Sequence, residues 1–587
     1  MSDHEELIRL RAENEVLRRE IEGLRNESQR PDEWDDFDIP PPGASSWPSR
    51  RYVPQPSLDA RLAALVPLIC SVLRSDRCVA LLLFAIVAVP YFAGAVGVMN
   101  SMDGPQYALT RAIVDRHTLS INGYEWIYPD FALVDGKQYS QRSPGISFLA
   151  APLYLYSRAF ATHLWPPYLV QNNKGITHES ALEAMSYGMT GLIGAATVAL
   201  FFLIVRQHGA GMSAAVAAAL VYGFGSLLWA YASSFVREPG TILFLFGAYL
   251  AYLLARKEPR QRDVLLVGIC SGLAIFCDNL ALFPAVILLS TTLLVVFRGG
   301  WTKLMLLVVV GFLVGLLPLV VYNLRVFDRP YVIQYLYAQR EILHHTELHL
   351  LADPFWSVGA NLFNWGALPK RAVPYVDHYP EWADAVSTVW ALKSPYKGIL
   401  VQSPILVLAI GYAVLHGRRD RSLLLPLVVA ASFFLPLSRT SYFFNPNNFD
   451  TRYFLPATAF LFVPLGAAFE RINKQRGGSR VALVLAAALL ALISLLNGWD
   501  GVLQNYTPHQ TGNERASISL IARRAAPFSA KIVEAFYATF PNYANVLYLL
   551  PIVILLVLYA LALPLQRLGV SDMSSSQLEG TTPRYGQ

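Results

Sequence analysis

Charged side chains are scarce in this sequence, at 15% of its 587 residues, whereas 54% of the residues are hydrophobic. A soluble protein typically carries about 25% charged residues. The shortage comes from repeated apolar runs, each long enough to cross about 30 Å of hydrocarbon as a helix. The composition therefore excludes a soluble globular enzyme and predicts a polytopic membrane protein.

Cysteine is also scarce, with four residues, and no two of them have the C-x-x-C spacing of a zinc or redox site. We expect all four to be packing residues. The sequence begins with polar and charged residues instead of an apolar signal peptide. The net charge of +6 comes mostly from arginines in short loops, so it indicates no nucleic-acid partner.

Three segments precede the apolar runs. Residues 1–26 have a heptad pattern of leucines, with Asn14 on the apolar seam, which favours a parallel two-stranded coiled coil. We predict a cytoplasmic helix that forms a homodimer or binds a partner protein; the alternative is a solvated charged helix, because so short a coiled coil is marginal alone. Residues 27–58 are predicted to be a disordered, Pro-rich linker, and residues 59–77 an interfacial helix.

Residues 78–567 are predicted to form one transmembrane domain of about 12 helices, an all-α polytopic fold. The apolar stretch 147–163 is ambiguous, and the positive-inside rule assigns it to the outer membrane surface. With the N-terminus inside, fourteen basic residues fall in short inner loops and three in short outer loops. The outer three are Arg237, Arg439 and Arg452, and the inner ones are Arg206, Arg256, Lys257, Arg260, Arg262, Arg298, Lys303, Arg418, Arg419, Arg421, Arg471, Lys474, Arg476 and Arg480.

This topology places three large segments outside, at about 100–183, 324–397 and 498–544, and a disordered tail, 568–587, in the cytoplasm. The middle of each predicted span lacks ionisable residues, which argues against an ion-coupled transporter or channel. Ionisable groups gather instead where outer loops meet the membrane: Asp103, Asp115, Lys137, Arg142, Arg237, Glu238, Asp278 and Arg452. This level suits a substrate with a lipid tail and a polar head.

The first outer segment has an acid near its start, Asp103, and two cations near its end, Lys137 and Arg142. A carboxylate can take the proton of an acceptor hydroxyl, and cations can stabilise a departing phosphate. Simpler interpretations remain for each residue. Asp103 could cap the helix expected from Pro105, and the cations could anchor the loop to lipid headgroups. Arg452 could extend to the interface, and Glu238 could simply pair with its neighbour.

Several motifs resemble those of the C-type glycosyltransferases, especially bacterial relatives of protein O-mannosyltransferases and the lipid A aminoarabinose transferase. "MDGPQYALTRAIVDRHTLSI" and "DGKQYSQRSPGISFLAAPLY" are similar to the first outer loop of that family. "SSFVREPGTILFLF", "YNLRVFDRPYVIQY", "SPYKGILVQSPILVLAIG" and "NNFDTRYFLPATAFLFVPLG" follow in the family's order. The resemblance covers roughly residues 78–470.

The resemblance implies an inverting transferase that uses a polyprenyl-phosphate-linked sugar and an acceptor glycan, lipid or protein at the extracytoplasmic face. Asp103 occupies the position of the family's catalytic carboxylate, with Gly104 where a second acid often follows. Arg142 matches a basic residue before the loop's Pro, with Lys137 as a near alternative, and "RSPG" in place of Lys-Pro-Pro leaves the sugar open. Glu238 matches a polar residue opening the fourth span and is predicted, with Asp103, to be catalytic. Arg452 matches a basic residue opening a late span and is predicted, with Arg142 and Lys137, to contact the substrate phosphate.

The sequence also offers a candidate metal site and two alternative functions. His345 and His349 are one helical turn apart and could hold a divalent metal, but they lack the HExxH order, so we expect no metal and no cofactor. The alternative functions are a lipid-diphosphate glycan ligase or polymerase, and a lipid or glycan flippase, which the charge-free spans disfavour. The richness in Ala, Leu, Val and Arg favours a bacterial plasma membrane protein.

Overall fold

The computed structural model describes residues 75–95, 103–124, 130–163, 178–232, 234–332, 334–337, 399–418, 420–437 and 452–505, with residues 552, 554 and 556. The chain divides into two units, Met1–Leu65 and Val66–Gln587, and every described residue lies in the second. The predicted coiled coil, the linker and the tail therefore lie outside the described residues, as do most of the interfacial helix and of the last span.

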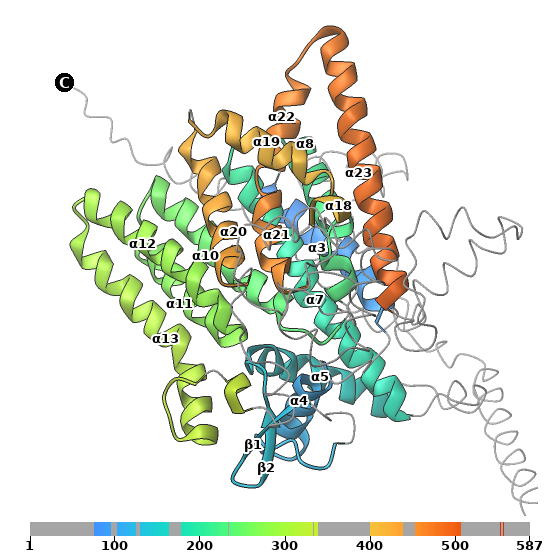
Figure 1. The fold of residues 1–587 in the computed structure, drawn as a ribbon, viewed down its shortest axis with the longest axis vertical. Coiled ribbons are helices and arrows are strands. Elements are labelled where there is room, and N and C mark those ends of the chain that lie inside the picture. The colour runs from blue at the N-terminus through green and yellow to red at the C-terminus, as the bar shows by residue number, and fades with distance from the viewer. Residues whose placement is uncertain are drawn as a thin grey trace, which may run out of the picture. The chain divides into compact units, whose positions relative to one another are not determined.

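Helices make up nearly all of the described structure (Figure 1). The first half contains α3 (Asp76–Ala93), α4 (Gly104–Asp115), α5 (Gly145–His163), α7 (His178–Gln207), α8 (Met212–Phe224), α9 (Leu228–Ala232), α10 (Glu238–Lys257), α11 (Gln261–Cys277), η2 (Asn279–Ala281), α12 (Leu282–Arg298) and α13 (Thr302–Phe327). The second half contains η3 (Gln334–Tyr337), α18 (Ile399–Gln402), α19 (Leu406–His416), η6 (Arg421–Leu423), α20 (Leu424–Leu437), η8 (Arg452–Phe454), α21 (Leu455–Phe462), α22 (Leu465–Asn473) and α23 (Gly477–Asn505).

The predicted all-α polytopic membrane fold is confirmed by the length and composition of these helices. Seven described helical segments are long and apolar enough to cross a membrane, and three shorter apolar helices accompany them. Helix α5 covers the ambiguous stretch 147–163 and is not among the seven. The number of twelve spans stays a prediction.

Three of the predicted spans are broken where glycine or proline interrupts the helix. The breaks fall around Gly225, at Pro404 and at Pro464. At the two prolines the helix is interrupted because proline lacks the N–H group that continues a helix. Side chains satisfy some of the backbone groups that the breaks release: the Ser403 hydroxyl donates to the carbonyl of Gly225 (2.9 Å), and the Ser494 hydroxyl accepts from the N–H of Ile405 (3.2 Å). Such compensation is what an apolar surrounding requires.

Helix α7 lies at the centre of the bundle, with 78% of its apolar window buried. It packs against α3, α5, α8 and α10. Helices α13 and α23 are the opposite case, with 28% and 11% of their windows buried. Their exposed leucines and valines form an apolar outer surface of the kind that a bilayer covers.

The only strands among the described residues form a hairpin, β1 (Phe131–Val134) and β2 (Lys137–Ser140), which pair antiparallel. The strands are joined by a turn at Asp135-Gly136, where both residues have positive φ, 49° and 74°, as two-residue hairpin turns require. Figure 1 shows the hairpin beside α4 and α5, and β2 contacts α4. The first outer segment thus forms a small substructure of its own.

Candidate functional site

Asp103 immediately precedes α4 and is buried, with 3% of its surface exposed. Its backbone carbonyl accepts from the N–H groups of Gln106 and Tyr107, both at 3.1 Å, but its side chain makes no capping hydrogen bond. The carboxylate instead interacts electrostatically with the phenol of Tyr187 on α7. The structure therefore contradicts the capping interpretation of this acid.

Three aromatic rings connect the start of α4 with the start of α10. The ring centroids of Tyr107, Tyr187 and Phe235 lie 5.2 to 5.4 Å apart in all three pairs. Phe235 is only two residues before Arg237, which precedes the first residue of α10. Because Asp103 contacts the same group through Tyr187, its carboxylate and the start of α10 border one aromatic cluster.

The N-terminal parts of α4 and α5 lie side by side. The Ser147 hydroxyl donates to the carbonyl of Gln106 (2.8 Å), and the Thr110 hydroxyl donates to the carbonyl of Ser147 (3.1 Å). Asp103 is one turn before Gln106, and Arg142 is five residues before Ser147. The two residues predicted to act together thus enter the fold at adjacent helix starts.

Two glycines allow three helix ends to meet. A Cβ atom on Gly145, at the start of α5, would lie 2.6 Å from the Cα and 2.7 Å from the Sγ of Cys277, the last residue of α11. A Cβ on Gly240, in the first turn of α10, would lie 3.2 Å from the same Sγ atom. This close packing brings together the charged residues next to these ends: Arg142, Arg237, Glu238 and Asp278.

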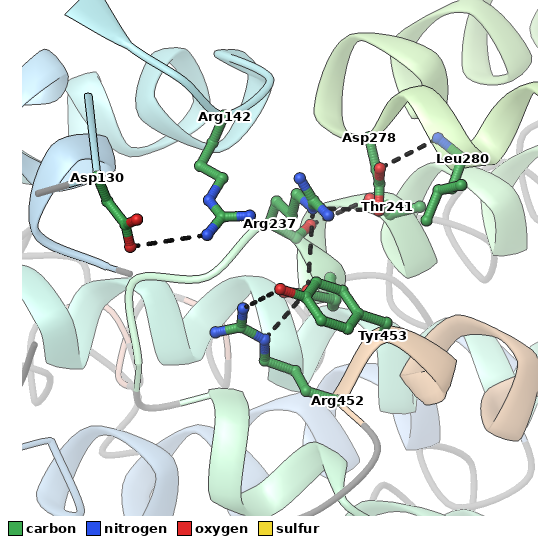
Figure 2. A network of polar contacts seen from close by, with 9 residues as sticks. Asp130, Arg142, Arg237, Thr241, Asp278, Leu280, Arg452 and Tyr453 are labelled. Atoms are coloured by element: carbon green, nitrogen blue, oxygen red, sulfur yellow. Dashed lines mark hydrogen bonds and ion pairs between the residues drawn. The ribbon is translucent and has the colours of Figure 1, made fainter. Parts of the chain in front are cut away.

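Arg237, Glu238, Asp278 and Arg452 form a network of ion pairs, and Figure 2 shows this network with Arg142 and Asp130 beside it. The Nε atom of Arg237 is 3.2 Å from Asp278 Oδ2 and 3.9 Å from Glu238 Oε1. The Nε atom of Arg452 is 3.4 Å from the same Glu238 oxygen. We call Arg142, Arg237 and Arg452 the arginine cluster.

Arg142 belongs to this cluster but pairs with a different acid. Its Nη2 atom is 3.7 Å from Asp130 Oδ2, and Asp130 also accepts a hydrogen bond from Gln141 (2.8 Å). Arg142 interacts electrostatically with Asp278 and with Tyr453, so the two sides of Figure 2 face each other.

Tyr453 supplies an aromatic surface beside two of the arginines. The guanidinium carbon of Arg452 is 5.0 Å from its ring centroid and that of Arg237 is 5.7 Å away. Arg452 also donates a hydrogen bond to the Tyr453 hydroxyl (3.4 Å). Such contacts hold a guanidinium in place against an aromatic ring.

Asp278 joins α11 to η2. Its Oδ1 atom accepts from the N–H of Leu280 (3.1 Å), which caps the short helix. Burial raises the pKa of the Asp278 carboxyl above its ordinary value, against the opposing effects of Arg237 and Arg142. The carboxyl therefore binds a proton more readily than an exposed aspartate does.

The cluster is too buried to be an ordinary surface feature, since Glu238, Asp278, Arg452 and Arg142 are 1%, 3%, 5% and 8% exposed. Buried ion pairs contribute little net stability, because desolvation offsets their attraction. Ionisable groups concentrated at helix ends in a membrane bundle are instead typical of functional sites. Guanidinium groups match phosphate oxygens in geometry, so the arrangement is suited to a phosphate group.

The structure does not bring Lys137 to this cluster. Lys137 is exposed at the turn end of the hairpin, where it pairs with Val134. Lys137 and Ser140 lie at opposite ends of β2, three residues of about 3.3 Å each apart, and Arg142 follows the Ser140 end. His345 and His349 lie outside the described residues. Within the ranges that the structure describes, no three His, Cys, Asp or Glu side chains gather as a metal site would require.

The sequence analysis did not single out Asp130, Tyr187 or Tyr453, which the structure adds to the site. Tyr187 sits within an apolar span, where one tyrosine among many carries no local signal. Asp130 was detectable only as a charge in an aromatic stretch of the first outer segment.

No protein-family profile and no curated protein matches the sequence. Among solved structures, it is similar to ArnT from Cupriavidus metallidurans bound to undecaprenyl phosphate, with a TM-score of 0.42 and 12% identity over 89% of this chain and 82% of that one.

A second similarity is to the apo oligosaccharyltransferase of Archaeoglobus fulgidus, with a TM-score of 0.42 and 13% identity over 79% of this chain. The chain spans 60% of that protein's length. The archaeal enzyme AglB in complex with an inhibitory peptide and a dolichol-phosphate gives a TM-score of 0.38 and 12% identity, with 79% and 59% covered. These neighbours are members of the C-type glycosyltransferase family that the sequence motifs resemble.

Proposed function

We propose that this protein is a membrane glycosyltransferase that moves a sugar from a polyprenyl-phosphate donor to an acceptor hydroxyl at the extracytoplasmic face. The observation that carries the proposal is the buried arginine cluster at the meeting point of α5, α10, α11 and η8. Its guanidinium groups suit the donor phosphate, and the buried Asp103, which contacts Tyr187, suits a general base.

In the proposed reaction, the Asp103 carboxylate accepts the proton of the acceptor hydroxyl. The acceptor oxygen then attacks the anomeric carbon of the sugar from the side opposite the phosphate. The bond between that carbon and the phosphate oxygen breaks, and its electron pair leaves with the polyprenyl phosphate. The configuration at the sugar carbon inverts, and the arginine cluster stabilises the leaving phosphate.

The roles of the other predicted residues follow from their contacts. We assign Arg142 and Arg452 to the donor phosphate. Glu238 was predicted as a catalytic residue, but its position between Arg237 and Arg452 favours a role in positioning the two guanidinium groups. Among the described residues, its carboxylate oxygens accept no hydrogen bond, so its contacts with the two arginines are ion pairs alone.

The first prediction concerns the base. Asp103→Asn keeps the size of the side chain but removes the group that accepts the proton, so sugar transfer should fall by about a hundredfold or more. The measurement is transfer from a labelled polyprenyl-phosphate-linked sugar in membranes that contain equal amounts of folded protein.

Asp135→Asn is the matched control. Asp135 is an exposed acid of the same outer segment, and asparagine tolerates its positive φ of 49°. Transfer by this variant should equal that of the wild type. Wild-type rates in the Asp103→Asn variant would contradict the assignment of the base.

A further inference from the structure

The ion pairs of the arginine cluster join equal numbers of arginines and acids. Arg142, Arg237 and Arg452 are paired with three carboxylates: those of Asp130, Glu238 and Asp278. The formal charges of these six groups cancel. A buried set without net charge has no excess of positive charge with which to bind a phosphate, and adding an anion would leave uncompensated negative charge in a surrounding of low polarity.

Uptake of a proton by one carboxylate would remove this difficulty. It would neutralise one acid and weaken the attraction of one guanidinium group to that acid, so that the group could bind the anion. The question is which of the three carboxylates is placed to take the proton.

Asp278 is the best placed of the three. Asp130 is the most exposed of them, at 14% of its side chain, and water can stabilise its charge. Glu238 lies at ion-pair distance from two guanidinium groups, those of Arg237 and Arg452. Asp278 is 5% exposed by side chain and has one arginine at ion-pair distance, Arg237.

Groups from several neighbouring elements face Asp278. Burial raises the pKa of its carboxyl, Glu238 adds to that effect, and Arg237 and Arg142 oppose it. The N–H of Leu280 in η2 donates to it, and the thiol of Cys277 precedes it on α11. The neighbouring Asn279 contacts Gln334 of η3, and Gln334 contacts Asn323 of α13; all three are amides that do not titrate.

We propose that Asp278 is a positioning residue that binds a proton when the arginine cluster binds a phosphate, which releases Arg237 to contact the anion. This inference rests on the proposed function and adds a residue that the family resemblance did not assign. Anion binding and proton binding are then linked, so the affinity for the anion rises as the pH falls.

The test is binding of a short-chain polyprenyl methyl phosphodiester to the full chain in lipid nanodiscs, between about pH 6 and pH 8. The diester keeps one negative charge throughout this range, because it lacks the second ionisation of a monoester, whose pKa is about 6. If one proton enters with each anion, the affinity of the wild type should fall by up to about tenfold for each rise of one pH unit.

Asp278→Asn imitates the protonated carboxyl and can still accept from Leu280. This variant should bind the diester at the higher pH as tightly as the wild type does at the lower pH, with little further dependence on pH. Asp278→Glu, which restores a titrating group, should restore the dependence. Asp263→Asn is the matched control, because Asp263 is a buried acid at the other end of α11, paired with Arg262, and should leave the wild-type dependence unchanged.

The outcomes separate this inference from the proposed function. A pH-independent affinity in the wild type, or the same pH dependence in Asp278→Asn, would overturn the role of Asp278 while leaving the Asp103 experiment unaffected. Failure of the wild type to bind the diester at any pH would overturn this inference together with the phosphate-binding role of the cluster.

Discussion

Arg142 and Lys137 lie five residues apart in the sequence but in different surroundings. Arg142 is 8% exposed and faces Asp278 and Tyr453, whereas Lys137 is exposed at the turn end of the hairpin. The sequence alone left open which of the two contacts the donor phosphate. The structure favours Arg142, because a buried cation loses less of its attraction to solvent screening.

This difference gives a prediction at the scale of single residues. Arg142→Ala should lower kcat/KM for the donor by about 10- to 100-fold, the effect expected when one charge-assisted contact is lost. Lys137→Ala should change it by less than about twofold, as is usual for an exposed charge. Steady-state transfer assays over a range of donor concentrations measure both values. Equal losses in the two variants would show that Lys137 on the hairpin contributes as much to phosphate binding as Arg142 does.

The direction of the Asp103 side chain depends on contacts that only the fold supplies. Aspartate before a helix that begins near proline is a common capping pattern, so the sequence predicted catalysis but left capping as an alternative. The side chain makes no cap bond and faces Tyr187 instead. Side-chain direction of this kind depends on α7, which is some eighty residues away, so no local pattern reveals it.

At the scale of elements, the site depends on the contact of α5 and α10 with the end of α11. The breaks at Gly225, Pro404 and Pro464 were not predicted, although the residues that cause them were visible in the sequence. An apolar run indicates a span by its length, and it does not show whether neighbouring helices supply hydrogen bonds that make a break acceptable. Here Ser403 and Ser494 supply them.

The contact of α5 with α11 gives a second prediction. Gly145→Ala would place a Cβ atom within 2.6 Å of the Cys277 backbone, so the helices must separate. We expect a loss of about 1–3 kcal/mol of stability and a strong loss of transfer, because Arg142 and Asp278 would move apart. Thermal unfolding in detergent and the transfer assay measure the two effects.

Gly411→Ala is the control for this prediction. Gly411 lies inside α19 with nothing within 4 Å of the added Cβ atom, so alanine should be neutral or slightly stabilising there. A Gly145→Ala variant that behaves like Gly411→Ala would show that the meeting of α5 and α11 does not position the site.

At the scale of the whole molecule, the orientation in the membrane decides which compartment the site faces. The predicted topology puts the first segment with Asp103 and the hairpin outside, and the basic loops inside. Lys137 in the hairpin and Lys303 at the start of α13 are both exposed, so they can report the two sides.

Cysteine labelling tests this orientation in intact cells. A membrane-impermeant thiol reagent should label Lys137→Cys directly and Lys303→Cys only after the membrane is made permeable. The unsubstituted protein gives the background; two of its described cysteines, Cys78 and Cys277, are buried. The reverse labelling pattern would turn the site toward the cytoplasm and contradict the proposed reaction at the outer face.

The sequence by itself determined the fold class, because apolar runs of membrane length leave few alternatives to a helical bundle. It also indicated Asp103, Arg142, Glu238 and Arg452, since charges beside apolar spans are costly and therefore conspicuous. Only the tertiary structure decided that Arg237 and Arg452 share Glu238, that Asp130 holds Arg142 and that Lys137 stays apart. These pairings depend on close packing between helix ends that are distant in sequence, and periodicity and charge describe one segment at a time.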